Sequence, residues 1–271
     1  MNDPLLVAYF TLLAFLGGAC IGSFLNVCIH RIPREESIVH PRSRCPSCGT
    51  LIAWYDNIPV LSFFLLRGRC RHCSARISVR YPLVELLTAG LFLAVWNRYA
   101  FDPRALLFMA VVGGLIVATF VDFDFMIIPD RISLGGMPAG LLASALVPSL
   151  HGAQTAGEAL VASLIGIVAG SGSLYLVAWL GRLAFKKDAM GMGDVKLLGA
   201  IGAFLGWPGV IFTVLLSSLL GSVAGVALIL AGGKGWQSRI PYGPYIAAAA
   251  VIWILGGDRW WYAYVNWLLG G

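Results

Sequence analysis

Two groups of carboxylates stand beside apolar sequence, and these residues could do chemistry at a membrane. The first group comprises Asp122 and Asp124, with apolar residues on both sides, and then Asp130. The second is Asp194, which closes a Gly-Met-Gly-Asp motif. A carboxylate near lipid costs several kcal/mol unless it is paired or reaches water. We therefore treat these carboxylates as candidates for function.

Asp122 and Asp194 can form a catalytic pair if both lie at cytoplasmic helix ends. One carboxylate, ionised, would take a proton from water, and the other, protonated, would donate to a scissile carbonyl. Close like charges make such a pair share one proton. Positions 122 and 124 lie about 200° apart on a helix, so at most one of them faces a given partner. The spacing alone does not choose between them.

The same carboxylates also have structural interpretations. Asp130 would serve as an N-cap for the helix that follows it, and Asp124 would meet headgroup water. The Gly-x-Gly before Asp194 is expected to break the helix and to let another backbone approach closely. The sequence has no G-x-S-x-G or H-E-x-x-H motif that would supply a competing nucleophile or metal site.

Four cysteines follow the pattern C-x2-C-x21-C-x2-C, which is the spacing of a zinc ribbon. The predicted ligands are Cys45, Cys48, Cys70 and Cys73. Four thiolates leave no open position on a tetrahedral ion, so the predicted Zn²⁺ is structural. Two disulfides are the alternative, which a reducing cytoplasmic loop disfavours, and a redox C-x2-C is another. We interpret Cys20 and Cys28 as packing residues.

The rest of the chain must position these groups within a membrane. Hydrophobic residues make up 59% of the chain, charged residues 12%, and mean hydropathy is +0.83. The sequence predicts an all-α polytopic membrane protein of about eight transmembrane helices, with a small zinc-ribbon-like insert between the first two. The first span lacks a basic n-region, so we interpret it as retained and not as a signal peptide. The predicted spans are 5–27, 83–97, 105–123, 132–149, 158–181, 195–206, 208–231 and 244–257.

Positive charge is concentrated in loop 29–81, which holds nine Arg against Glu35, Glu36 and Asp56. A basic patch could bind nucleic acid, but between membrane spans it indicates a cytoplasmic loop, and we expect no nucleic-acid partner. With that loop inside and the spans alternating, sixteen basic residues lie inside and three outside. The inside residues beyond the loop are Arg131, Arg182, Lys186, Lys187, Lys196, Lys234 and Arg239, and the outside ones are Arg98, Arg104 and Arg259. Membrane lipid is therefore an expected partner, and the Trp- and Tyr-rich tail 260–269 suits the membrane interface.

The motifs together resemble the type IV prepilin peptidases, membrane aspartyl proteases of the GxGD type that also process type II secretion pseudopilins. The matching segments are 22–27, 31–33, the two Cys pairs, 56–59, Gly68, 80–85, 122–130, 191–194 and 240–244. The resemblance assigns the catalytic roles to Asp122 and Asp194, and so selects Asp122 over Asp124. It implies a multi-pass enzyme of the bacterial inner membrane that cleaves the short basic leader from prepilins and pseudopilins on the cytoplasmic side.

The resemblance also implies a second activity, N-methylation of the new N-terminal residue with S-adenosylmethionine. No Rossmann-type G-x-G-x-x-G unit is present, so we expect the cofactor in or beside loop 29–81. Gly68 and Glu85 are candidate cofactor-binding residues, although Glu85 could instead anchor the loop to a helix. The cationic sulfonium favours an aromatic face or carboxylate nearby, which could come from Trp54, Tyr55, Asp56 or Glu85.

These expectations divide the chain into a first transmembrane helix (1–28), a zinc-binding loop with the methyltransferase region (29–81), and a peptidase core (82–271). Two other hypotheses remain. One is a peptidase alone, in which the zinc loop docks substrate. The other is a transporter or scaffold whose Asp residues bind ions, for which paired half-helices or repeats are expected and not found.

Overall fold

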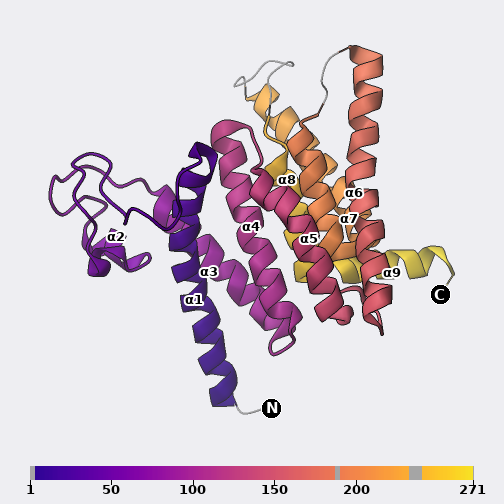
Figure 1. The fold of residues 1–271 in the computed structure, drawn as a ribbon, viewed down its shortest axis with the longest axis horizontal. Helices are drawn as coiled ribbons and strands as arrows, with labels where there is room; N and C mark the ends of the chain where they lie inside the picture. The colour runs from indigo at the N-terminus through magenta and orange to yellow at the C-terminus, as the bar shows by residue number, and fades with distance from the viewer. Residues whose placement is uncertain (1–3, 187–189, 232–239, 271) are drawn as a thin grey trace. The chain divides into compact units, whose positions relative to one another are not determined.

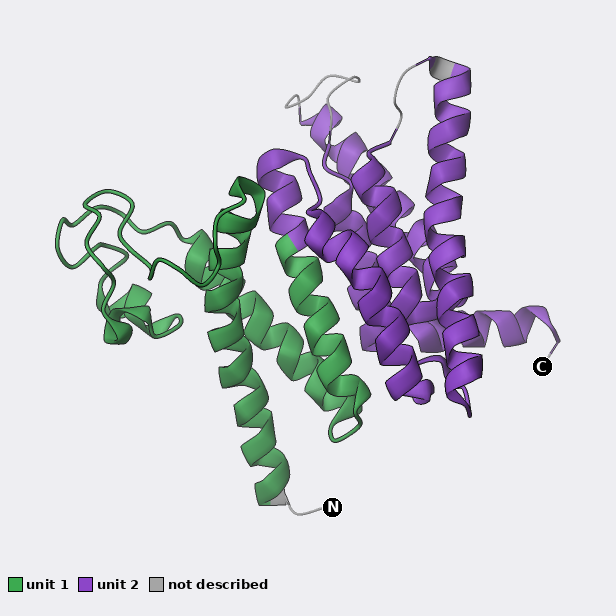
Figure 2. Ribbon diagram, in the orientation of Figure 1, with its two compact units in different colours: residues 1–117 green, residues 118–271 purple. Residues whose placement is uncertain are grey.

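The computed structural model describes residues 4–186, 190–231 and 240–270 and separates them into two compact units. Unit 1 spans Met1–Val117 and unit 2 spans Ala118–Gly271 (Figure 2). Across the described residues the structure is helical, with two isolated β-bridges and no strand, as predicted. Lys187, Lys234 and Arg239, which the orientation count placed inside, lie outside the described residues.

Unit 1 is built on two helices that pack closely, α1 (Pro4–Arg31) and α3 (Arg80–Tyr99). A Cβ on Gly22 would lie 2.7 Å from the Cα of Glu85, so only glycine permits this approach. Near the other end of the pair, the rings of Phe10, Trp96 and Phe101 stack and meet edge to face. The pair therefore has a tight contact at the loop end and an aromatic cluster at the far end.

The insert between α1 and α3 has little regular structure. It contains the short helices η1 (Ile32–Arg34), η2 (Trp54–Asn57) and α2 (Leu61–Leu65), joined by turns (Figure 1). Few of its side chains are buried, and its large apolar residues, such as Trp54, Phe64 and Leu65, remain exposed. A segment with so small a core needs another source of stability.

Unit 2 is a helix bundle. Its elements are the end of α4 (Arg104–Phe125), α5 (Asp130–Leu146), η3 (Pro148–His151), α6 (Ala156–Phe185), α7 (Met192–Leu230), α8 (Gly243–Ile252), η4 (Trp253–Gly257) and α9 (Asp258–Leu268). Helices α6 and α7 make the most extensive contact. A Cβ on Gly166 would lie 2.0 Å from the carbonyl oxygen of Gly202, so the two backbones touch there. Such small-residue contacts are typical of helix pairs in membranes, where close packing replaces the hydrophobic effect.

The stretch labelled α7 is two helices that meet at Gly206, which has the non-helical angles φ 68° and ψ 178°. A Cβ on Gly202 would lie 3.0 Å from a methyl carbon of Val210. Eight residues of continuous helix would separate these positions by about 12 Å, so the chain folds back at Gly206. The sequence predicted this break, because it ended one span at 206 and began the next at 208.

The chain is a multi-pass membrane protein. Four helices among the described residues are long and apolar enough to cross a membrane: Leu5–Arg34, Arg104–Phe125, Ala156–Ala184 and Met192–Leu230. The last of these has 39 residues, and its fold-back provides two of the predicted spans. The other predicted spans coincide with α3, α5 and α8, which are shorter or less apolar. Helix α9 presents Trp260, Tyr262, Tyr264 and Trp267 at its surface, as an interfacial tail would.

Two matched glycine substitutions in α6 test its backbone contact with α7. Gly166→Ala should destabilise the purified protein in detergent by about 2 kcal/mol or more, because the new methyl group would overlap the Gly202 carbonyl. Gly172→Ala, on the same helix with no atom within 4 Å of its Cβ, should not destabilise it. Thermal unfolding measures both, and equal stability of the two variants would contradict the contact.

Candidate active site and metal centre

Asp122 lies near the end of α4, where its side chain is buried. Its Oδ2 accepts a hydrogen bond of 3.0 Å from the backbone N–H of Gly243, the first residue of α8. A Cβ on Gly243 would lie 2.8 Å from that oxygen and 3.1 Å from Cδ1 of Ile128. The carboxylate therefore receives a donor from a distant segment, and a glycine is required at that point.

Asp194 lies in the first turn of α7 and is also buried. The preceding Gly193 faces Ile128, whose Cβ lies 3.1 Å from where a Cβ on Gly193 would be. Ile128 thus contacts the glycine beside each carboxylate, and it draws the starts of α7 and α8 to the end of α4. The structure brings the two predicted site residues together.

The other two carboxylates point elsewhere. Asp124 is exposed, so the expectation that only one of positions 122 and 124 faces inward is confirmed. Asp130 is the first residue of α5, and its Oδ1 lies 2.8 Å from Nζ of Lys196. The N-cap position belongs to Pro129 without a side-chain cap, so the N-cap interpretation of Asp130 is wrong. Lys196 follows Asp194 by two residues, and the ion pair links the starts of α5 and α7.

Tyr242 holds the segment that reaches Asp122. Its hydroxyl lies 2.8 Å from Oγ of Ser217 and 3.2 Å from Oγ of Ser218, both on the second half of α7. These contacts fix Tyr242, which directly precedes Gly243. The sequence indicated no role for Tyr242 or Gly243 beyond their place in the motif 240–244, which carries part of the family resemblance.

The four predicted metal ligands also lie together. Their sulfur atoms all fall within 4.8 Å of one another, and the Cys45 and Cys73 sulfurs are 3.8 Å apart. A tetrahedral ion with Zn–S bonds of about 2.3 Å requires S···S edges of about 3.8 Å. The cysteines are free thiols at distances too long for a disulfide, which argues against the disulfide alternative. The cluster could therefore hold a metal ion.

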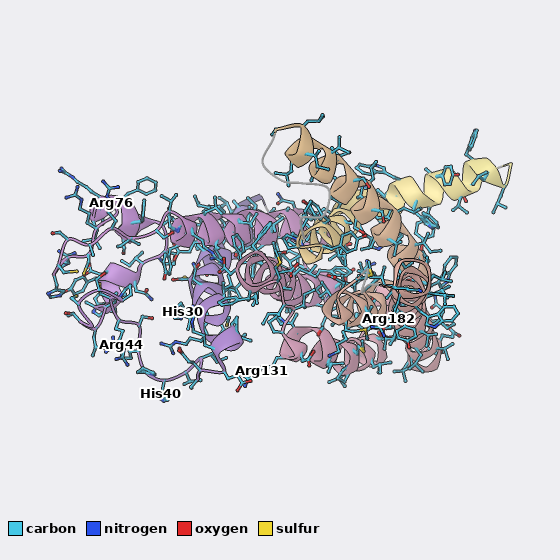
Figure 3. All side chains as sticks on the ribbon, turned by 90° about the horizontal axis from the view of Figure 1, so that it is seen from above. His30, His40, Arg44, Arg76, Arg131 and Arg182 are labelled. Atoms are coloured by element: carbon cyan, nitrogen blue, oxygen red, sulfur yellow. The ribbon has the colours of Figure 1, made fainter. Side chains whose placement is uncertain are left out.

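The cluster is made by two turns of the same design, each closed by an antiparallel bridge. In the first turn, the Cys45 N–H donates to the Thr50 carbonyl, and the Gly49 N–H donates to the Cys45 carbonyl. The second repeats both bonds with Cys70, Ala75 and Ser74. Ser74 adopts φ 57° where the first turn has Gly49 at φ 70°. Arg44 and Arg76 flank the two turns and are labelled in Figure 3.

Hydrogen bonds favour the thiolate form at two of these cysteines. The Thr50 side chain and backbone lower the pKa of the Cys48 thiol to about 6. The backbone N–H groups of Cys73 and His72 lower the pKa of the Cys70 thiol. Thiolates are the form that binds metal.

Comparison with known proteins agrees with this arrangement. Residues 16–99 match the family model described as the bacterial peptidase A24 N-terminal domain, and residues 109–226 match the type IV leader peptidase family. A protein of Myxococcus xanthus named prepilin leader peptidase/N-methyltransferase is 41% identical over 83% of this chain and 65% of its own length. Proteins of the same name from Aeromonas hydrophila and Pseudomonas aeruginosa are 41% and 36% identical, over 93% and 92% of this chain and 93% and 91% of their own lengths. No solved structure matches.

The chain belongs to the type IV leader peptidase family. It is therefore a member of a family of proteolytic enzymes, as the sequence motifs predicted. The match covers both the insert with its four cysteines and the helices that carry Asp122 and Asp194.

The residues predicted to bind the cofactor make contacts within the protein itself. Oε2 of Glu85 accepts a 2.7 Å hydrogen bond from the Val60 N–H, and Glu85 also bonds to the Ser23 side chain. The hydrogen bond from Val60 attaches the insert to α3. Val60 has φ 62°, a strained value for a β-branched residue. Gly68 has φ 65° and ends the turn after α2, and Asp56 is bonded to Arg71, which lowers the pKa of its carboxyl. Glu85 thus has the contacts of the loop-to-helix anchor.

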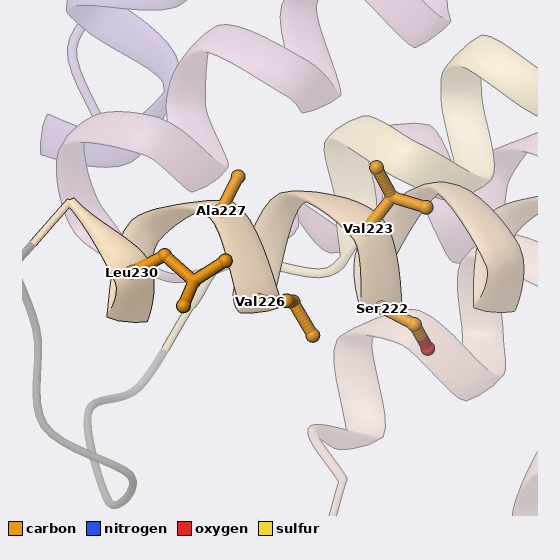
Figure 4. Close-up of a pocket in the computed structure, with 5 residues that line it drawn as sticks. All are labelled: Ser222, Val223, Val226, Ala227 and Leu230. Atoms are coloured by element: carbon orange, nitrogen blue, oxygen red, sulfur yellow. The ribbon is translucent and has the colours of Figure 1, made fainter.

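Each of the two units has a hollow among its described residues. A shallow groove of ≈420 Å³ runs along the last turns of α7, lined by apolar residues and Ser222 (Figure 4). None of the predicted site residues lines it. The other lies in unit 1, between α1 and the insert.

The contact between Gly243 and Asp122 can be tested by substitution. Gly243→Ala should reduce leader cleavage at least about 100-fold, because a methyl group would displace the Asp122 carboxylate. Gly221→Ala is the matched control, since its Cβ would make ordinary 3.5 Å contacts with Tyr242 and Tyr245. Initial rates of the two purified variants on one substrate measure the difference. Full activity of Gly243→Ala would contradict the site.

Proposed function

We propose that this chain is a leader peptidase of prepilins and pseudopilins in which Asp122 and Asp194 are the catalytic pair. The observation that carries the proposal is that these two carboxylates are buried around Ile128, whereas Asp124 and Asp130 are exposed or ion-paired elsewhere. The names of the relatives support the substrate class.

The pair performs the chemistry as two acid–base groups. One carboxylate removes a proton from water, whose oxygen then attacks the scissile carbonyl carbon. The other donates its proton to the carbonyl oxygen. Collapse of the tetrahedral intermediate breaks the C–N bond, and the leaving amine takes a proton from the pair. The Gly243 N–H holds Asp122 in place and leaves its second oxygen available.

The proposed orientation places this pair at the cytoplasmic face of the bacterial inner membrane. The excess of basic residues in loop 29–81 supports it, since such loops remain inside. A substrate with a short basic leader and an apolar helix would then present its cleavage point at the membrane edge, beside the start of α7.

We propose that the four cysteines bind one structural Zn²⁺. The S···S distance fits a tetrahedral ion, and the insert lacks a core that would hold it without one. The ion would join the two turns and so fix the segment between them, which includes η2 and α2.

We further propose that the chain methylates the amine that cleavage releases, as the names of its relatives suggest. S-adenosylmethionine supplies an electrophilic methyl group on a sulfonium. The amine nitrogen forms a bond to that methyl carbon, the C–S electron pair stays with sulfur, and one N–H proton passes to solvent. The amine exists only after cleavage, so methylation comes second.

Single substitutions test the pair. Asp122→Asn and Asp194→Asn should each lower leader cleavage at least about 1,000-fold, because each removes one acid–base partner. Asp124→Asn, two residues away on the same helix, should cleave at nearly the normal rate. Quantified cleavage of a purified substrate in detergent compares the three. Normal cleavage by Asp122→Asn or Asp194→Asn would refute the pair.

Metal analysis tests the ion. The purified protein should contain about one zinc per chain, and Cys48→Ser should lower that content and loosen the insert to proteases. Cys20→Ser, outside the cluster, should keep its zinc. Protein purified without chelators that holds no metal and four reactive thiols would overturn the assignment.

A further inference from the structure

The hollow in unit 1 has the size and position of a ligand site. It occupies ≈470 Å³ between the loop end of α1 and the insert, within the ~300–1,000 Å³ typical of small-molecule pockets. We call it the α1 cavity. Its lining includes Ser23, Phe24, Arg31, Arg42, Trp54 and Asn57.

One end of the α1 cavity is cationic. The Arg31 guanidinium donates hydrogen bonds of 2.8 and 2.7 Å to the carbonyls of Ser37 and Pro41, and so fixes the wall formed by that loop. Arg42 follows directly and also lines the cavity. The two guanidinium groups favour an anionic group at this end.

The other end has a carboxylate behind its wall. Ser23 lines the cavity eight residues before Arg31, about 12 Å along α1. The Ser23 side chain is hydrogen-bonded to Glu85, whose side chain is buried. The close approach at Gly22 places α3, and with it Glu85, at this position. The α1 cavity therefore has two arginines at one end and, behind its wall at the other end, the carboxyl group of Glu85.

The lining also has two aromatic side chains that the fold leaves uncovered. Trp54 is 76% exposed and Phe24 is 45% exposed. The Trp54 and Tyr55 rings lie nearly perpendicular with centroids 5.7 Å apart, and most of the indole remains exposed to a ligand. Aromatic faces bind flat heterocycles by stacking and cations by cation–π attraction.

We infer that the α1 cavity binds S-adenosylmethionine, an inference that rests on the methyltransferase activity proposed above. The ligand carries a carboxylate, which suits Arg42 and Arg31, and a sulfonium, which suits the potential from Glu85. Its adenine suits the exposed indole of Trp54. The α1 wall belongs to a candidate membrane span, so the amine of a membrane-anchored substrate can reach the ligand from the lipid side.

Equilibrium binding of S-adenosylmethionine and of S-adenosylhomocysteine to the full-length, metal-loaded protein in neutral-lipid nanodiscs tests the site. The two ligands differ by the methyl group and by the positive charge on sulfur. Glu85→Gln keeps an acceptor for the Val60 N–H but loses the charge, so it should weaken the cationic ligand about tenfold and the neutral one much less. Arg42→Gln and Trp54→Ala should weaken both ligands about tenfold.

Two control variants and the metal content separate the outcomes. Arg76→Gln and Trp260→Ala remove an exposed Arg and an exposed Trp outside the α1 cavity, and both should bind as the unmodified protein does. Trp54 is 76% exposed, so its truncation should leave the insert folded, which retained zinc would show. If the unmodified protein binds but Arg42→Gln and Trp54→Ala bind normally, the site is wrong and the proposed activity stands. If the unmodified protein binds neither ligand, the proposed methyl transfer fails as well.

An anionic phospholipid is the competing occupant, because its headgroup would also suit Arg31 and Arg42. Nanodiscs with anionic lipid should leave S-adenosylmethionine binding within about twofold of that in neutral lipid. If anionic lipid abolishes binding, and Arg42→Gln restores it, the cavity is a lipid site and the inference is overturned.

Discussion

A carboxylate inside an apolar helix bundle is stable only where a donor or a proton-sharing partner reaches it, and unit 2 is arranged around that requirement. Asp122 has its donor in the N–H of Gly243, 121 residues away along the chain. Asp194 has the first turn of α7, where the helix dipole favours negative charge. Ile128 packs against the glycine next to each carboxylate. Larger residues at Gly193 or Gly243 would separate these elements.

Unit 1 also contains a buried carboxyl group with hydrogen-bond donors, and there it attaches the insert to the helix pair. Glu85 is buried at the contact of α1 and α3, and its donors are the Val60 N–H and Ser23. These bonds attach an insert that has almost no core to the helix pair. The insert also contains the two cysteine turns, and hydrogen bonds with Thr50 favour the thiolate form of Cys48 in the first of them. The buried Glu85 and the proposed metal centre would thus supply stability that buried apolar area supplies in larger domains.

The sequence was sufficient for features whose signals are local. The cysteine spacing indicated one cluster, and the apolar runs located the helices, including the break at Gly206. The helical period showed that Asp122 and Asp124 could not both face inward. The resemblance was needed to choose Asp122, because spacing treats the two alike.

Contacts between distant segments were beyond the sequence. Nothing local to Gly243 or Val60 indicates that each donates its N–H to a carboxylate in another helix. Asp130 looked like an N-cap because acidic residues are common there, but Lys196 was available as a partner across the bundle. The α1 cavity likewise combines three separate segments, and no short motif describes it.

The central claim is that Asp122 and Asp194 act together on one tetrahedral centre. Binding of a substrate-derived peptide with a secondary alcohol in place of the scissile amide measures this directly, because such a group mimics the intermediate and needs both carboxylates. Asp122→Asn and Asp194→Asn should each bind it at least about 100-fold more weakly than the unmodified protein does, whereas Asp124→Asn should bind it normally. Normal affinity in folded Asp122→Asn, or a loss only in Asp124→Asn, would contradict the account.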